Sequence, residues 1–286
     1  EVLVRLQLPT SLGELLAGVL IGASGLHLLV PPETQVELSN GVISLVSGLV
    51  NVPPDAVPEI YNESFPSLEA VAELGLYALL FLTGLESELE ELIAVGAQAF
   101  TVAVAGVVLP FALGTWGLMA IFHVDAIPAI FAGASMTATS IGITASVFSE
   151  LGFLKTREGQ IVIGAAVLDD ILGIVILAVV VALASGGNLE IGPIVKLVAA
   201  AAVFVVAAIG LSRTAAPAFD WMIDKLKAPG EVLVASFVIL ALSCFTATAI
   251  GLEAALGAFA AGLILSSSKH NHAIQQAVLP IVTLFA

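Results

Sequence analysis

Long apolar runs separated by short polar connections dominate this chain. A membrane-spanning helix needs about 20 mostly apolar residues, because lipid offers no partner to backbone N–H and C=O groups. Eight runs meet this requirement and predict eight membrane-spanning helices. They lie at 11–30, 67–85, 97–122, 127–149, 159–185, 193–212, 231–249 and 252–267. A stub at 1–8 and an apolar run at 277–286 lead us to expect that both ends of the chain fall within helices.

Composition supports a location in the membrane. Charged residues make up 11% of the chain and hydrophobic residues 59%, whereas soluble domains contain about 25% charged residues. The pattern therefore predicts an all-α polytopic membrane protein. A net charge of −15 excludes a surface for nucleic acid. Cys244 is the only cysteine, which excludes a disulfide scaffold, and no basic segment indicates a cleavable signal peptide.

The basic residues predict the orientation, because Lys and Arg in short loops favour the cytoplasmic side. If Arg5 is inside, seven of the eight basic residues share the inner side and only Lys196 lies near an outer end. The acidic inner stretch 86–91 does not oppose this orientation, because acidic residues contribute little to the rule. The only long external loop is then 31–66. Its apolar piece, 38–52, is too short to span, and we expect it to lie on the surface or to be re-entrant.

Two segments resemble each other and predict an internal repeat. L-G-E-L-L-A-G-V-L-I-G begins at Leu12 and L-G-A-F-A-A-G-L-I-L-S begins at Leu256. The first runs from inside to outside and the second from outside to inside, which is the pattern of the inverted repeats of secondary transporters. The second repeat would then be truncated in a parent chain of roughly 430 residues or more. Small residues at this spacing also favour close helix packing without a repeat.

Two adjacent carboxylates carry the strongest chemical signal. Asp169 and Asp170 lie near the middle of the run 159–185, within G-A-A-V-L-D-D-I-L-G. A charged carboxylate at that depth costs about 2.5–3.5 kcal/mol, and such residues are functional by default. Burial and mutual repulsion favour the protonated form, which moves proton release towards working pH. The pair predicts a site for a proton or a monovalent cation, and the alternative is a structural pair neutralised by a basic residue elsewhere.

Hydroxyl side chains interrupt the preceding apolar run, in G-A-S-M-T-A-T-S-I-G between Gly133 and Gly142. Small and hydroxyl residues allow a helix to break, so that its carbonyl groups and half-helix ends face an ion. The alternative is a close-packing interface whose hydroxyls bond back to the helix. Beside a pair of buried carboxylates, a helix break at an ion site is the better interpretation. The hydroxyl residues are Ser135, Thr137, Thr139 and Ser140.

The remaining polar residues give weaker signals. Glu73 and Glu253 lie near outer helix ends and Glu14 near an inner end, where we interpret each as solvated. The four histidines lie at helix ends or in loops and are not spaced as metal ligands. They are His27, His123, His270 and His272. His270 and His272 can sense pH, but a solvated loop is the better explanation of them.

Four motifs together resemble the monovalent cation:proton antiporter-2 family. They are T-A-T-S-I, A-A-V-L-D-D-I-L, L-G-A-F-A-A-G-L-I-L-S, and L-G-L-Y-A-L-L-F-L-T-G-L-E at 74–86 with an F-x-x-G-L-E ending. The resemblance implies a homodimer of 12–13-helix protomers with discontinuous helices and an elevator-like mechanism. It implies dimerisation helices over 1–85 and 231–286, an ion-binding core over 97–185, and a linker helix with an inner loop over 186–230.

The resemblance also implies roles for individual residues. Asp170 would be the main site at which H⁺ and Na⁺ compete, and Asp169 would pair with a lysine of a later helix. Thr139 and Ser140 would complete the coordination of Na⁺, with Thr137, Gly133 and Gly142 supporting the helix break. The chain stops before the second discontinuous helix and that lysine, and its 31–66 loop is longer than the usual connection.

We therefore expect a secondary transporter that exchanges Na⁺, or K⁺, for H⁺ and serves pH homeostasis, with no enzymatic chemistry and no cofactor. A gated K⁺ efflux system of the same fold is the alternative. An intramembrane aspartyl protease is disfavoured, because it needs carboxylates from two different helices. A non-transporting scaffold leaves the Asp pair unexplained. The expected partners are membrane lipids and a second copy of the chain, in a bacterial plasma membrane or an internal photosynthetic (thylakoid) membrane.

Overall fold

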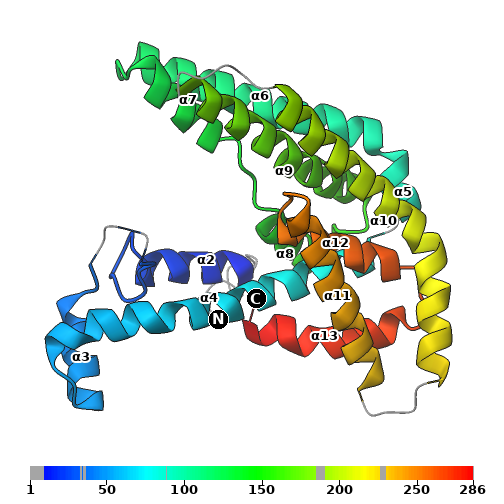
Figure 1. Cartoon of the computed structure of the whole chain (residues 1–286), viewed down its shortest axis with the longest axis horizontal. Helices are drawn as coiled ribbons and strands as arrows, with labels where there is room; N and C mark the ends of the chain where they lie inside the picture. Colours follow the sequence, from blue (N-terminus) through cyan, green and yellow to red (C-terminus); the bar gives the residue numbers. More distant parts are fainter. Residues whose placement is uncertain are drawn as a thin grey trace. The chain divides into compact units, whose positions relative to one another are not determined.

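The computed structural model describes residues 10–32, 34, 37–87, 89–184, 191–225 and 230–285, and Figure 1 shows them as helices joined by short connections. No strand occurs within these ranges, and the predicted all-α class is confirmed. The stub predicted at 1–8 and parts of the predicted linker, 186–190 and 226–229, lie outside the described residues. The chain divides into two compact units, one with the described residues up to Gly75 and Phe285, the other with Leu76–Leu284.

Several helices have the length and composition of membrane spans. Within the described residues, four helical stretches are long and apolar enough to cross a bilayer. They are Pro54–Glu86, Gly96–Ala120, Val195–Lys225 and Glu231–Ala249. This agrees with the polytopic membrane protein that the sequence predicts.

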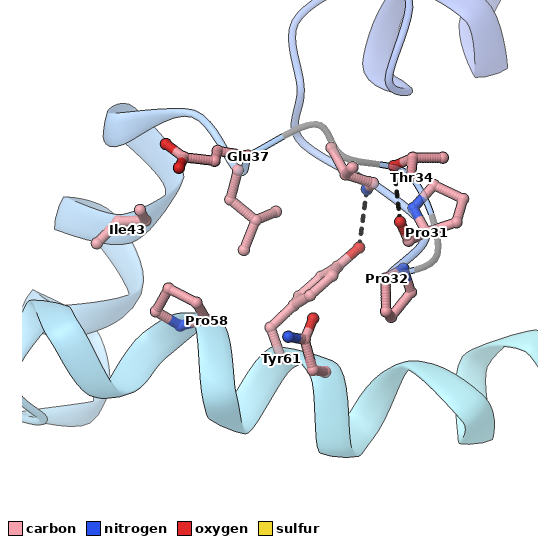
Figure 2. A pocket seen from close by; sticks show the side chains of 10 residues that line it. Pro31, Pro32, Thr34, Glu37, Ile43, Pro58 and Tyr61 are labelled. Atoms are coloured by element: carbon pink, nitrogen blue, oxygen red, sulfur yellow. Dashed lines mark hydrogen bonds between the residues drawn. The ribbon is translucent and has the colours of Figure 1, made fainter.

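The first unit contains α2 (Thr10–Ile21), α3 (Asn40–Val50), the short helix η1 (Pro54–Ala56) and the start of α4 (Val57–Glu86). The apolar piece predicted at 38–52 forms α3, and Ser39 caps its first turn by accepting a hydrogen bond from the Val42 N–H. With 11 residues, α3 is too short to span a bilayer, as predicted. Figure 2 shows the Tyr61 hydroxyl reaching the loop, where it accepts a 2.9 Å hydrogen bond from the Val30 N–H beside a cavity of about 460 Å³.

The prediction of a spanning helix at 11–30 is wrong in its second half. The helix α2 ends at Ile21 after 12 residues, which is about 18 Å of helix. The N–H groups of Leu28 and Leu29 both donate to the Ile21 carbonyl, at 2.8 and 2.9 Å. The chain therefore folds back through Gly22 and Gly25. At Gly25 a side chain would collide with the carbonyl groups of the last turn of α2.

The second unit contains the rest of α4 and all later helices. These are α5 (Leu89–Ala94), α6 (Gly96–Ala120), α7 (Ala126–Ser135), α8 (Ile141–Glu150), α9 (Arg157–Ala184), α10 (Ile191–Lys225), α11 (Glu231–Ala249), α12 (Ala254–Leu265) and α13 (Asn271–Phe285). The helix α6 packs on both α7 and α9, and α12 packs on both α10 and α11. The run predicted as one helix at 127–149 is two helices, α7 and α8, with a break between them.

The helix α12 lies at the centre of the second unit. Every residue from Ala255 to Leu265 is buried, although the helix has only 12 residues. It crosses α4 where Gly84 meets Gly262: a Cβ atom added to Gly262 would lie 2.9 Å from the Gly84 Cα atom and 2.8 Å from the Leu85 N atom. Small residues at a crossing let two helix backbones approach closely. Gly262, which belongs to the motif that begins at Leu256, is thus required for the close packing of α12 on α4.

The helix predicted at 193–212 is longer in the structure, because residues 213–225, within the segment 186–230 in which an inner loop was expected, continue α10. The helix has 35 residues and passes through Pro217. Its second half buries Ala216, Phe219 and Ile223 on one face, and the latter two join the apolar cluster around Phe81 and Leu240. An apolar face at helical spacing therefore extends the helix beyond the predicted run 193–212.

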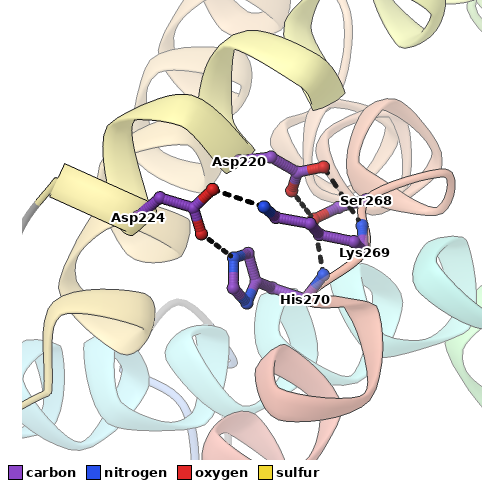
Figure 3. A network of polar contacts seen from close by, with 5 residues as sticks. All are labelled: Asp220, Asp224, Ser268, Lys269 and His270. Carbon is purple, nitrogen blue, oxygen red and sulfur yellow. Dashed lines mark hydrogen bonds and ion pairs between the residues drawn. The ribbon is translucent and has the colours of Figure 1, made fainter.

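Polar contacts tie the end of α10 to the corner between α12 and α13 (Figure 3). The Asp220 carboxylate accepts hydrogen bonds from the Ser268 hydroxyl and, at 3.2 Å, from the Lys269 N–H. The Asp224 carboxylate pairs with the Lys269 ammonium and, at 3.3 Å, with His270 Nε2. Ser268 is buried, whereas Asp224 and Lys269 are each about half exposed. The Asp220 contacts are therefore the stronger ones, because solvent screens the pair at Asp224.

This difference predicts unequal effects of two matched substitutions. Asp220→Asn should lower the melting temperature of the full-length protein by the equivalent of about 1–3 kcal/mol, because it weakens two hydrogen bonds to a charged acceptor. Asp224→Asn should lower it less. The measurement is thermal unfolding in detergent, and equal shifts for the two variants would contradict this account of the corner.

The crossing of α4 and α12 gives a second prediction. Gly262→Ala should destabilise the protein by about 1–3 kcal/mol, because the added methyl group meets backbone atoms that cannot turn away. Gly106→Ala is the control, since an added Cβ atom there meets nothing within 4 Å. Thermal unfolding measures both variants. A Gly262→Ala protein as stable as the Gly106→Ala protein would show that the helices are not in close contact.

Candidate ion-binding site

The chain leaves helical geometry between Met136 and Ser140, within the segment in which the sequence predicts a break. The helix α7 ends with the Met136 N–H donating to the Ala132 carbonyl at 3.1 Å. The helix α8 begins after Ser140, whose hydroxyl accepts a 3.3 Å hydrogen bond from the Ile143 N–H. Ser140 is therefore the N-cap of α8. The break brings the carbonyl end of one half-helix and the N–H end of another to the same level of the fold, and these ends carry opposite partial charges.

Glycines on both sides of the break let the half-helices pack closely. A Cβ atom added to Gly133 would collide with the Thr115 hydroxyl and lie 2.9 Å from the Phe111 carbonyl oxygen of α6. A Cβ atom added to Gly142 would lie 2.7 Å from the Leu76 side chain of α4. The two glycines among the three residues predicted to support the break thus face neighbouring helices. Their contribution is close packing, not ligand atoms.

The hydroxyl groups of the segment differ in what they bind. Thr137 is buried and donates to the Ala134 carbonyl at 2.8 Å. Ser135 donates back to the Phe131 carbonyl at 3.0 Å and belongs to α7 alone. Thr139 makes only a long 3.5 Å contact with the Thr137 carbonyl. Of these hydroxyls, Thr139 is the one least committed to the backbone.

Asp169 lies opposite the break, on α9. Its side chain is 6% exposed, and neither carboxylate oxygen has a hydrogen-bond partner among the described residues. Thr139 presents its hydroxyl and its backbone N–H to this carboxylate without completing a hydrogen bond. The structure therefore brings Asp169 and Thr139 together. A buried carboxylate without a partner is costly, and such a group normally has a bound proton, an ion or an opposite charge as its partner.

Asp170 has a different environment from its neighbour. It is partly buried, and the charges that act on it are those of Asp169 and of Glu253, the residue before α12. Both are negative, so a cation or a proton at Asp170 relieves repulsion. The sequence pattern alone does not connect Glu253 with Asp170, because the two are 83 positions apart and Glu253 lies at a helix end.

The site offers carboxylate, hydroxyl and carbonyl oxygens, which suit a proton or a hard monovalent cation. No group of three or more His, Cys, Asp or Glu side chains could hold a metal ion in the part of the chain that the structure describes. The predicted ligands Asp169, Asp170, Thr139 and Ser140 all come from the break and the facing helix α9. Thr115 was not predicted. Its buried hydroxyl has no partner among the described residues and lies against Gly133.

Known proteins with similar sequences identify the family. A family model described as sodium/hydrogen exchanger, transmembrane, matches residues 2–286. The chain belongs to this family. It is 47% identical over 286 residues to the high-affinity Na⁺/H⁺ antiporter NhaS3 of Synechocystis sp., a match that covers 100% of this chain and 62% of that protein.

More distant relatives of this chain carry names that include different cations. The chain is 27% identical over 278 residues to the Na⁺/H⁺-K⁺ antiporter GerN of Bacillus cereus, covering 97% of this chain and 62% of that protein. It is 30% identical over 270 residues to a Na⁺/H⁺ antiporter of Enterococcus hirae, covering 94% and 62%. The chain thus spans somewhat less than two thirds of the length of these relatives. The predicted cation:proton antiporter resemblance and the multi-pass membrane location are confirmed.

The N-cap at the break gives a prediction that does not depend on transport. Ser140→Ala should lower the melting temperature of the full-length exchanger by the equivalent of about 0.5–2 kcal/mol, because α8 loses its capping oxygen. Ser140→Thr should retain most of the stability, since threonine also caps. Ser135→Ala is the control in the same segment. If Ser135→Ala and Ser140→Ala destabilise equally, Ser140 does not act as the cap.

Proposed function

We propose that the full-length protein is an antiporter that exchanges Na⁺, and with lower preference K⁺, for H⁺ across its membrane. The observation that carries this proposal is the buried Asp169 carboxylate, which lacks a hydrogen-bond partner and faces a helix break beside Asp170. Membership of the sodium/hydrogen exchanger family supports it. The names of the relatives favour Na⁺ over the gated K⁺ efflux alternative, because each of these three names includes Na⁺.

Each site residue has a proposed role. Asp170 releases its proton in one access state and binds the cation in its place. Thr139 supplies hydroxyl or carbonyl oxygen to the cation, and Ser140 helps by holding the start of α8, where its hydroxyl caps the helix. Asp169 keeps the site negative and pairs with a basic residue of the full-length protein, as the family resemblance implies. Competition for one carboxylate then couples the two ions, because the site cannot hold a proton and a cation at once.

The transport cycle and the assembly are also proposals. The core helices within 97–185 would move against the helices within 1–85 and 231–286 in an elevator-like cycle, with 186–230 as the linker. The protein would be a homodimer built from inverted repeats. A bacterial plasma membrane, or an internal photosynthetic (thylakoid) membrane, would contain it.

The decisive measurement uses the full-length protein in proteoliposomes with a trapped pH-sensitive dye. A proton gradient is imposed, and Na⁺ and then K⁺ are added. The unmodified protein should collapse the gradient when the cation is added, and Asp170→Asn should abolish the response, because the asparagine neither binds a proton nor carries a negative charge. The cation with the lower half-saturating concentration is the preferred substrate.

Controls separate the assigned residues from the function. Asp125→Asn should leave the response unchanged, since Asp125 lies before the first residue of α7 and not at the break. Normal exchange by Asp170→Asn would contradict the site assignment alone. If neither Na⁺ nor K⁺ collapses the proton gradient with the wild-type protein, the proposed antiport function is wrong.

A further inference from the structure

Glu253 lies where the loop after α11 turns into α12. Gly251 has a φ of +88°, which reverses the chain, and Leu252 then enters the core. Leu252 and Leu256 form an apolar cluster with Val167 and Ile171 of α9. Val167 and Ile171 flank Asp170 in sequence. The start of α12, with Glu253 between the two leucines, is therefore packed on the turn of α9 that carries Asp170.

The Glu253 side chain is acidic, and no capping hydrogen bond or ion pair among the described residues gives it a part in stabilising the fold. It is exposed, it occupies the N-cap position of α12, and it makes no capping hydrogen bond. No ion pair involves it among the described residues. The N-terminus of a helix favours a negative charge, and Glu253 lies at that end of α12. Its charge nevertheless acts on Asp170.

We infer that Glu253 is an electrostatic positioning residue that draws the cation to Asp170 and increases the affinity of the site for it. This inference rests on the proposed antiport function. A fixed negative charge beside an apolar site raises the local concentration of cations. A cation at Asp170 is attracted by both carboxylates, whereas without the cation their charges repel each other. Glu253 is exposed at the start of α12, and we assign it the role of a nearby fixed charge and not of a ligand.

The effect of Glu253 depends on the packing of α12 against α9. The two helices meet through the side chains of Leu252, Leu256, Val167 and Ile171. Any access state in which α9 moves away from the start of α12 separates the two carboxylates. The site then loses the attraction of Glu253 and releases its cation more readily. The residue thus makes cation affinity depend on the access state.

The test measures cation binding and transport in the full-length protein. Binding is followed by the rise in melting temperature as Na⁺ is added, since a ligand of the native state stabilises it. At low ionic strength, Glu253→Gln should raise the half-saturating Na⁺ concentration by about threefold to tenfold, as expected for one charge at a partly solvated distance. The maximal exchange rate in proteoliposomes should remain unchanged. Glu253→Asp should retain most of the affinity.

Salt dependence separates an electrostatic role from a structural one. High concentrations of choline chloride should shrink the difference between wild type and Glu253→Gln, because salt screens exposed charges. Glu73→Gln is the matched control: it removes an acidic group of α4 that is not among the charges acting on Asp170. Wild-type affinity in Glu253→Gln at low ionic strength would overturn the inference, as would a loss of affinity that is independent of salt.

The outcomes also separate this inference from the proposed function. If Asp170→Asn abolishes exchange while Glu253→Gln binds Na⁺ normally, only the role of Glu253 is wrong. If the wild-type protein shows no stabilisation by Na⁺ or K⁺ and no exchange, both proposals are wrong.

Discussion

The structure depends on one constraint: a carboxylate is buried half-way along a long helix, and neither of its oxygens completes a hydrogen bond among the described residues. Asp169 lies among apolar neighbours with both oxygens unpaired. In lipid-facing helices such a group is tolerated only where other parts of the protein surround it. The broken α7–α8 pair provides that surrounding, because Thr139 brings its hydroxyl and its backbone N–H to this carboxylate. The break therefore supplies polar groups to the buried carboxylate, and the buried carboxylate gives a reason for the break.

Glycine contacts fix the helices around this site. Gly133 holds α7 against α6, and Gly142 holds α8 against α4. At Gly133 the close neighbours include backbone atoms of Phe111 and Thr115, which cannot turn away, whereas at Gly142 the close neighbour is the end of the Leu76 side chain. The half-helices consequently keep their ends at the level of Asp169. Small residues in the 133–142 segment thus serve both of the purposes that the sequence left open, a helix break and a close-packing interface.

The sequence predicted those features that depend on local composition. Hydropathy located most of the helices, and the hydroxyl-rich segment and the paired aspartates predicted the break and the buried charge. The sequence-based predictions were wrong where contacts with distant parts of the chain decide where a helix ends. The helix predicted at 11–30 ends at Ile21, because the chain folds back there and the N–H groups of Leu28 and Leu29 donate to the Ile21 carbonyl. The helix α10 continues to Lys225, because Phe219 and Ile223 find an apolar cluster made by other helices. The relation of Glu253 to Asp170 required the packing of two helices that are far apart in sequence.

The packing of α12 bears on how such a site can move. Gly257 lies against the backbone of α11, where the Ser243 hydroxyl also donates to the Gly257 carbonyl at 2.7 Å, and Gly262 lies against α4. Backbone contacts of this kind cannot slide without separating. The contact of α12 with α9 is different, because it consists of apolar side chains, with Phe259 and Leu263 in one cluster and Leu252 and Leu256 in another. Side chains of this type can exchange partners at little cost in buried area. The side-chain interface of α9 with α12 is therefore the one that an elevator-like movement would use, and it is also the interface across which Glu253 acts on Asp170.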